Sequence, residues 1–226
     1  GPIAPPPVPA ASGDSKQAER VSRVLSAAVT QHLEGNLEKA AKGLKQAIDG
    51  GLREPALYSA LARIHYEMGE YEAAAAAYAR LAGMQPMHRT AHFNLAVCLG
   101  KQGRWEPAAE SFQRAFDVDR KSSEAMLGMG ICLLHLGRAD QALAAFNRFL
   151  VRHPEHEEAL FGKAVALQQA GRHEEATEFY GRVLAINPRS EEALGNLVAL
   201  CLAANDFDAA RQHAEALLAL QPQSIP

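Results

Sequence analysis

The chain has 226 residues, and its 23 Lys and Arg against 26 Asp and Glu give a formal net charge of -3 at neutral pH. This balance provides no basic field for phosphates, whose binding depends chiefly on clustered Lys and Arg, so we expect no nucleic-acid partner. No apolar run approaches the ~20 residues that a membrane-spanning helix requires, so we expect no direct membrane insertion.

Residues 1–14 precede the first predicted helix and are rich in proline. Gly1-Pro2 resembles the remnant of a cleaved purification tag. The prolines that follow fix φ and lack amide donors, so we predict a disordered linker over residues 1–14. The segment 6–9 also fits a ligand for an aromatic-lined groove, but we favour a linker to a preceding segment. Helix should begin at Asp14 or Ser15, because either is a competent N-cap.

Residues 21–224 repeat one pattern with a period of 34 residues and no insertion or deletion. In the unit 89–122, apolar residues follow helical spacing in two short segments, and Gly103 lies at the turn between them. The turn position holds Gly35, Gly69, Gly103, Gly137, Gly171 and Asn205. A second position, where two helices cross, holds Ala40, Ala74, Ala108, Ala142, Ala176 and Ala210. The six repeats are 21–54, 55–88, 89–122, 123–156, 157–190 and 191–224.

A period of ~34 residues with two helices per unit resembles the tetratricopeptide repeat (TPR) family. The resemblance covers about nine-tenths of the chain and implies an all-α fold over residues 15–226. It also implies a right-handed α-α superhelix, a solenoid in which each repeat contacts only its neighbours.

Candidate catalytic and metal-binding groups are sparse. His153 and His156 are three residues apart, and His88 and His92 are four apart. A zinc site needs three or four convergent ligands, and no further ligand is placed by spacing, so we expect no metal and no cofactor. No nucleophile is paired with a base and an orienting acid, so we predict that the protein is not an enzyme.

The cysteines are odd in number and lie inside predicted first helices, at Cys98, Cys132 and Cys201. We expect small buried apolar side chains rather than disulfides. Unpaired cysteines mildly favour a reducing, cytoplasmic compartment. The proline-rich leader is equally compatible with a periplasmic or membrane-anchored protein.

The resemblance implies that the first helix of each repeat lines a concave face through positions 2, 5, 6, 9, 12 and 13. Positions 5, 9 and 12 form one stripe along the helix, which is largely apolar in this chain. The second repeat interrupts it with Ser59, Arg63 and Tyr66. The predicted groove residues are Leu25, Val29, Arg63, Tyr66, Phe93, Asn94, Val97, Leu127, Ile131, Leu134, Phe161, Val165 and Asn196. We expect Gly128, Gly162 and Gly195 to leave open floor beside this stripe.

Two interpretations of the stripe compete. Adjacent helices could cover most of it. Alternatively, it is a continuous apolar trough in the third to fifth repeats that binds a peptide or helical segment with apolar anchors. We favour the trough. Glu124, Glu158 and Glu192 form an acidic row along one rim, which we interpret as a solvated face because glutamate is common there in the family.

The sequence therefore predicts a non-catalytic protein–protein interaction scaffold. The alternative is a substrate-recognition or assembly module of a larger multidomain enzyme, in a chain that continues beyond both ends. Leu217, Leu218 and Leu220 would remain half covered on the last helix, so self-association through that helix is a further possibility.

Overall fold

The computed structural model describes residues 13–220. These residues form twelve helices and no strand. The helices are α1 (Gly13–Leu33), α2 (Leu37–Asp49), α3 (Pro55–Glu67), α4 (Tyr71–Met84), α5 (Arg89–Lys101), α6 (Trp105–Val118), α7 (Ser123–His135), α8 (Ala139–Leu150), α9 (Glu157–Gln169), α10 (His173–Ile186), α11 (Glu191–Ala203) and α12 (Phe207–Leu220). Residues 1–12 of the predicted proline-rich linker lie outside the described residues, whereas Gly13 and Asp14, which were also assigned to the linker, belong to α1.

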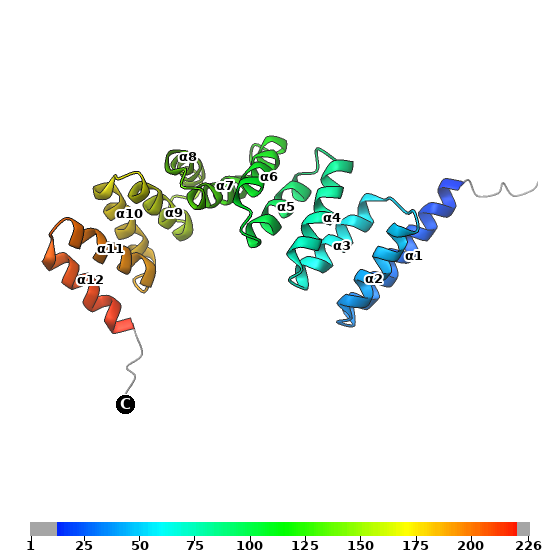
Figure 1. The fold of residues 1–226 in the computed structure, drawn as a ribbon, viewed down its shortest axis with the longest axis horizontal. Helices are drawn as coiled ribbons and strands as arrows, with labels where there is room; N and C mark the ends of the chain where they lie inside the picture. Colours follow the sequence, from blue (N-terminus) through cyan, green and yellow to red (C-terminus); the bar gives the residue numbers. More distant parts are fainter. Residues whose placement is uncertain (1–12, 221–226) are drawn as a thin grey trace, which may run out of the picture. The chain divides into compact units, whose positions relative to one another are not determined.

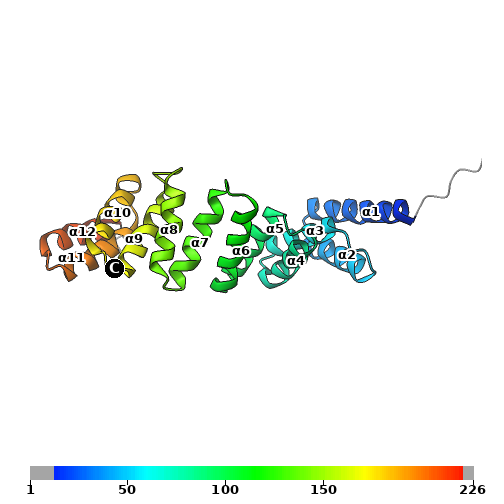
Figure 2. The same ribbon diagram turned by 90° about the horizontal axis from the view of Figure 1, so that it is seen from above.

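The chain divides into two compact units, of which the first ends at Cys98 and the second begins at Leu99, inside α5. In the first unit α1 packs beside α2, and α3 beside α4 (Figures 1 and 2). In the second unit the same pairing joins α7 to α8, α9 to α10 and α11 to α12. Each of these pairs corresponds to one predicted repeat, except that α1 begins at Gly13, before the first repeat starts at residue 21.

The turn inside each repeat requires a left-handed backbone conformation. The five glycines at this position have φ between 69° and 77°, and Asn205 in the last repeat has φ 59°. Glycine adopts this conformation without a steric penalty, and asparagine tolerates it better than most residues. In the second repeat the turn closes with hydrogen bonds from Gly69 N–H to the Tyr66 carbonyl and from Glu70 N–H to the His65 carbonyl. The short turn sends the second helix back along the first.

Small and aromatic residues share the crossing points between helices. The alanine that each repeat carries at the crossing position is buried in all six repeats. In the fourth repeat, Phe146 follows this alanine by four residues and is fully buried. Its ring lies against Gly130 of its own repeat and Gly162 of the next. A Cβ atom at Gly162 would lie 2.5 Å from Phe146 Cζ. Close helix approach therefore depends on a glycine under the ring.

This packing corrects one sequence-based expectation. Gly128 and Gly162 do not form open floor, because the rings of Phe112 and Phe146 lie over them. Gly195 is different, since nothing lies within 4 Å of the position that its Cβ would occupy. Only Gly195 fits the expectation of open space.

Two further features concern the apolar surface of the helices. No helix among residues 13–220 is long and apolar enough to cross a membrane. On α12, the Leu218 side chain is 65% exposed, and Leu217 and Leu220 are half-buried. Self-association through this helix stays a prediction.

Candidate partner-binding surface

None of the thirteen predicted groove residues is buried. Val29, Arg63 and Tyr66 are exposed, and Val29 retains 57% of its accessible surface. The half-buried ones in the first unit are Leu25, Phe93, Asn94 and Val97. The half-buried ones in the second unit are Leu127, Ile131, Leu134, Phe161, Val165 and Asn196. The first helices thus present a partly accessible stripe within each unit, whereas the continuous trough through the third to fifth repeats stays a prediction.

The first unit contains a cavity of about 370 Å³ between α1 and α3. Its lining is Leu25, Ala28, Val29, His32, Leu33, Ala60, Arg63 and Ile64. Three of these were predicted groove residues. The prediction missed His32 and Leu33. They occupy positions 12 and 13 of the first repeat, which are groove positions in the family, so the repeat numbering could have identified them. Leu33 is 81% exposed, which leaves a large apolar side chain at the cavity edge.

One carboxylate links the two polar side chains that line this cavity. The Glu67 carboxylate accepts from His32 Nε2 at 2.6 Å and from Arg63 Nε at 3.1 Å. The hydrogen bond from His32 is the main reason that the pKa of Glu67 lies below its usual value, and the bond from Arg63 adds to the effect. This network joins the end of α1 to the end of α3, so it supports the cavity wall.

Buried aromatic side chains hold the neighbouring groove residues in the first unit. Tyr78 is 6% exposed, and its hydroxyl is hydrogen-bonded to the side chain of Asn94. Burial raises the pKa of Tyr78, so the hydroxyl remains neutral. The rings of Tyr66 and Tyr71 meet edge to face with their centroids 5.5 Å apart. Asn94 and Tyr66 are therefore positioned by specific partners rather than left free.

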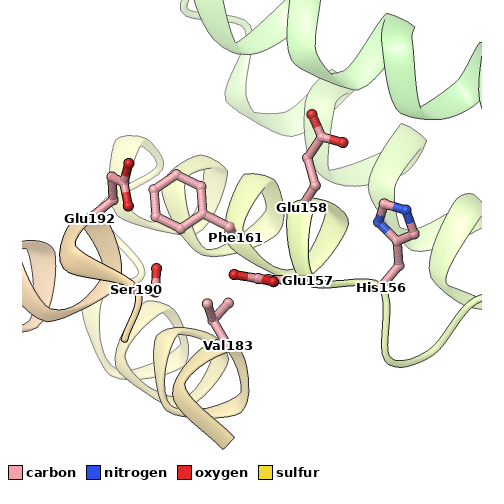
Figure 3. A pocket seen from close by; sticks show the side chains of 7 residues that line it. All are labelled: His156, Glu157, Glu158, Phe161, Val183, Ser190 and Glu192. Atoms are coloured by element: carbon pink, nitrogen blue, oxygen red, sulfur yellow. The ribbon is translucent and has the colours of Figure 1, made fainter. Parts of the chain in front are cut away.

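The second unit contains a cavity of about 460 Å³ at the starts of α9 and α11 (Figure 3). Its lining is His156, Glu157, Glu158, Phe161, Val183, Ser190 and Glu192. Phe161 is the one predicted groove residue among them. Figure 3 shows its ring directed toward the α11 side, where Glu192 lies. The sequence placed Glu158 and Glu192 on the rim, but nothing in it indicated that both would face a shared hollow.

Neighbouring residues fix the orientation of the Phe161 ring. The rings of Phe161 and Tyr180 meet edge to face at 5.7 Å, with 63° between their planes. Tyr180 is fully buried, and its hydroxyl donates to Gln168 Oε1 at 2.8 Å. At the cavity wall, Asn187 Nδ2 donates to Glu157 Oε1 at 2.7 Å. The aromatic wall is thus anchored in the core of its own repeat.

The histidines that suggested metal spacing have structural roles. His88 Nδ1 accepts from Ala91 N–H at 3.0 Å, and His156 Nδ1 accepts from Ala159 N–H at 3.4 Å, so each histidine caps the start of a helix. His92 is buried and bonded to the carbonyl of Pro86 at 2.8 Å. Among residues 13–220, no three His, Cys, Asp or Glu side chains are grouped to hold a metal ion.

The cysteines lie inside the helix pairs. Cys98, Cys132 and Cys201 are buried and form no disulfide. Burial raises the pKa of the Cys98 and Cys132 thiols to about 11. These thiols are therefore poor nucleophiles near neutral pH, because the thiolate is the reactive form.

The paired helices and their repeated spacing define the class of the protein as an α-helical repeat scaffold. A family model described as tetratricopeptide repeat matches residues 59–115, 99–152 and 136–191, and a second with the same description matches residues 167–226. Together these matches span well over half of the chain, and the protein belongs to the tetratricopeptide repeat family. Proteins of this family bind protein partners and are generally non-catalytic scaffolds. A protein–protein interaction scaffold is accordingly the broad class of this chain.

Solved structures share the same fold at low sequence identity. The structure titled "Crystal structure of YrrB: a TPR protein with an unusual peptide-binding site" is 19% identical, with a TM-score of 0.68 over 81% of this chain and 95% of that one. The type IV pilus biogenesis factor PilW is 18% identical, with a TM-score of 0.69 over 90% and 94% of the two chains. MamA from Desulfovibrio magneticus RS-1 is 16% identical, with a TM-score of 0.71 over 74% and 94%. No curated protein matches the chain. At these identities the likeness concerns the fold alone.

Proposed function

We propose that the protein binds a peptide or helical segment of a partner through apolar side chains of its first helices. The observation that carries this proposal is the cavity between α1 and α3. Its volume of about 370 Å³ is within the ~300–1,000 Å³ range of small-molecule pockets, which is room for one or two side chains of a partner. Leu33 and Val29 at its edge are 81% and 57% exposed, and a partner side chain seated there would remove both from water.

The driving force would be apolar burial, at roughly 25 cal/mol for each Å² removed from water. Ordering of the partner segment opposes it, so the affinity depends on how well one or two anchors fill the cavity. The network of Glu67, His32 and Arg63 gives the cavity one polar side. This asymmetry favours a segment with apolar anchors on one face and hydrogen-bonding groups on the other.

A selection from a random peptide library displayed on phage tests the proposal with the full chain as target. Enriched peptides should share apolar anchors, and their affinity should fall about tenfold in the variant Val29→Lys plus Leu33→Lys. Both residues are exposed, so the variant should fold. Met87→Lys plus Val151→Lys is the matched control, because it adds the same two charges at residues that are 75% and 82% exposed and do not line the cavity. The proposal fails if no peptide is enriched, or if the cavity variant and the control bind equally well.

The trough of the third to fifth repeats has a separate test with the same peptides. Phe93→Ala and Leu127→Ala each remove one half-buried apolar side chain of the predicted trough, and neither residue lines one of the two cavities. If the trough contributes, each variant should weaken binding of an enriched peptide. Unchanged affinity in both would restrict binding to the α1–α3 cavity.

A further inference from the structure

The cavity at the starts of α9 and α11 combines an aromatic wall, an apolar base and carboxylates. Phe161 is half-buried and held by Tyr180, and Val183 is 1% exposed. Glu158 and Glu192 line the same space from two successive repeats. Figure 3 shows the Phe161 ring on the side of Glu192, whereas Glu158 lies in the first turn of α9, with its carboxylate on the other side of Phe161. The space has room for one long side chain, because its volume is about 460 Å³.

The charges around this cavity are negative and only partly compensated. Glu157 has a hydrogen-bond partner in Asn187. Among the ion pairs of residues 13–220, none includes Glu158 or Glu192. Both lie in the first turns of α9 and α11, where the helix dipole is favourable to a carboxylate. That effect explains why a carboxylate is tolerated at each position, but it does not account for a half-buried aromatic ring in the same cavity.

An arginine side chain fits this combination better than other side chains. Its guanidinium is planar, stacks on aromatic rings and pairs with carboxylates, whereas its aliphatic stem packs on apolar surface. The chain already uses this contact elsewhere in the second unit. Arg148 lies 5.7 Å from the ring centre of Phe116, and Lys163 lies 3.9 Å from that of Phe179. Phe161 provides a half-buried aromatic ring in a cavity that two carboxylates also line.

We propose that this cavity binds a basic side chain, preferably arginine, from a partner segment, with the guanidinium against Phe161 and paired with Glu192, while Glu158 adds a second negative charge from the start of α9. The proposal depends on the proposed function only in requiring a protein partner. Because the cavity belongs to the second unit and the apolar cavity to the first, each site can fail without the other. The acidic row is then more than a solvated face at these two positions. Glu124, which accepts from the Ser122 hydroxyl at 3.2 Å, is not part of the cavity.

The test uses the full chain and an acetylated Gly-Arg-Ala-Arg-Gly amide peptide, followed by NMR chemical-shift perturbation. The matched peptide replaces each arginine with citrulline, which keeps the shape and removes the charge. We expect saturable shifts at the cavity residues with the arginine peptide and affinity about tenfold weaker with citrulline. Equal binding of the two peptides, or no binding of the arginine peptide, would overturn the proposal.

Variants separate the cavity from general electrostatic attraction. Glu158→Gln plus Glu192→Gln should weaken the arginine peptide about tenfold. Glu155→Gln plus Glu174→Gln removes the same net charge from exposed positions outside the cavity lining, and should change affinity far less. Phe161→Leu keeps an apolar wall and should reduce affinity by losing the aromatic face. If the two charge variants weaken binding equally, the attraction is nonspecific and the assigned site is wrong.

Discussion

Gly162 and Gly195 lie inside the first helices of two repeats, and we expect the stability of the protein to respond differently when each is replaced by alanine. In Gly162→Ala the new methyl group would lie 2.5 Å from Phe146 Cζ and 2.7 Å from Cε1. In Gly195→Ala it would meet nothing within 4 Å. Both glycines are interior to helices, α9 and α11, so the intrinsic helix preference for alanine acts in both variants.

The magnitudes follow from two competing effects. Alanine is better than glycine in a helix interior by about 1 kcal/mol. Gly195→Ala should therefore raise the free energy of unfolding by about 0.5–1 kcal/mol. Gly162→Ala has the same gain, but overpacking costs about 1–3 kcal/mol. The Phe146 ring is fully buried and also lies against Gly130, so we expect that moving it away from Gly162 would be costly.

Urea unfolding followed by far-UV circular dichroism measures this difference. We expect Gly162→Ala to be less stable than Gly195→Ala by about 1–3 kcal/mol. Replacing Phe146 with Leu should remove most of the penalty of Gly162→Ala, because two residues in contact do not act additively. If Gly162→Ala stabilises the protein as much as Gly195→Ala does, the ring does not pack on that glycine and the reasoning is refuted.

Three other predictions concern buried and ionised groups. Burial raises the pKa of the Cys98 and Cys132 thiols to about 11. At pH 8 a disulfide reagent should therefore label these two thiols rapidly only after the protein is unfolded. Labelling of both in native buffer as fast as in the unfolded protein would contradict their burial. Tyr180→Phe removes a buried hydroxyl donor and should lower the free energy of unfolding by about 1 kcal/mol in urea titrations; an unchanged midpoint would count against that hydrogen bond. The hydrogen bond from His32 lowers the pKa of Glu67 in the folded protein. The ionised carboxylate therefore stabilises the fold fully at pH values above the usual pKa of 4.5, and this stabilisation is lost as the pH falls through the folded-state pKa. The difference in melting temperature between wild type and Glu67→Gln should therefore be largest near pH 7 and disappear in acid.

The repeat architecture was predictable because its determinants are local. A tight turn with positive φ selects glycine, and a helix crossing selects a small side chain, whatever the rest of the molecule does. Both requirements recur every 34 residues, so the pattern predicted the helix pairs and the turn at Asn205, where asparagine replaces glycine at φ 59°. Family membership followed from the same periodicity.

Contacts between repeats were less predictable, because they depend on which neighbour fills a space. From the sequence, both Gly128 and Gly195 were predicted to leave open space beside the apolar stripe. One lies under the Phe112 ring and the other is open. The helix-capping role of His156 was also missed, since histidine is not among the usual N-cap residues.

The candidate binding sites were also hard to predict, because they depend on contacts that the repeat pattern does not specify. Glu124, Glu158 and Glu192 occupy one repeat position, and periodicity treats them as equivalent. Their surroundings differ, because Glu124 accepts a hydrogen bond from a serine of its own turn, whereas Glu158 and Glu192 line a cavity with Phe161. A charge on a solvated rim contributes little to binding, but a charge beside an aromatic wall in a hollow selects a partner side chain. Specificity in such a repeat protein therefore comes from what each repeat places next to its common positions, and repeats of one pattern can present one apolar site and one acidic site in the same chain.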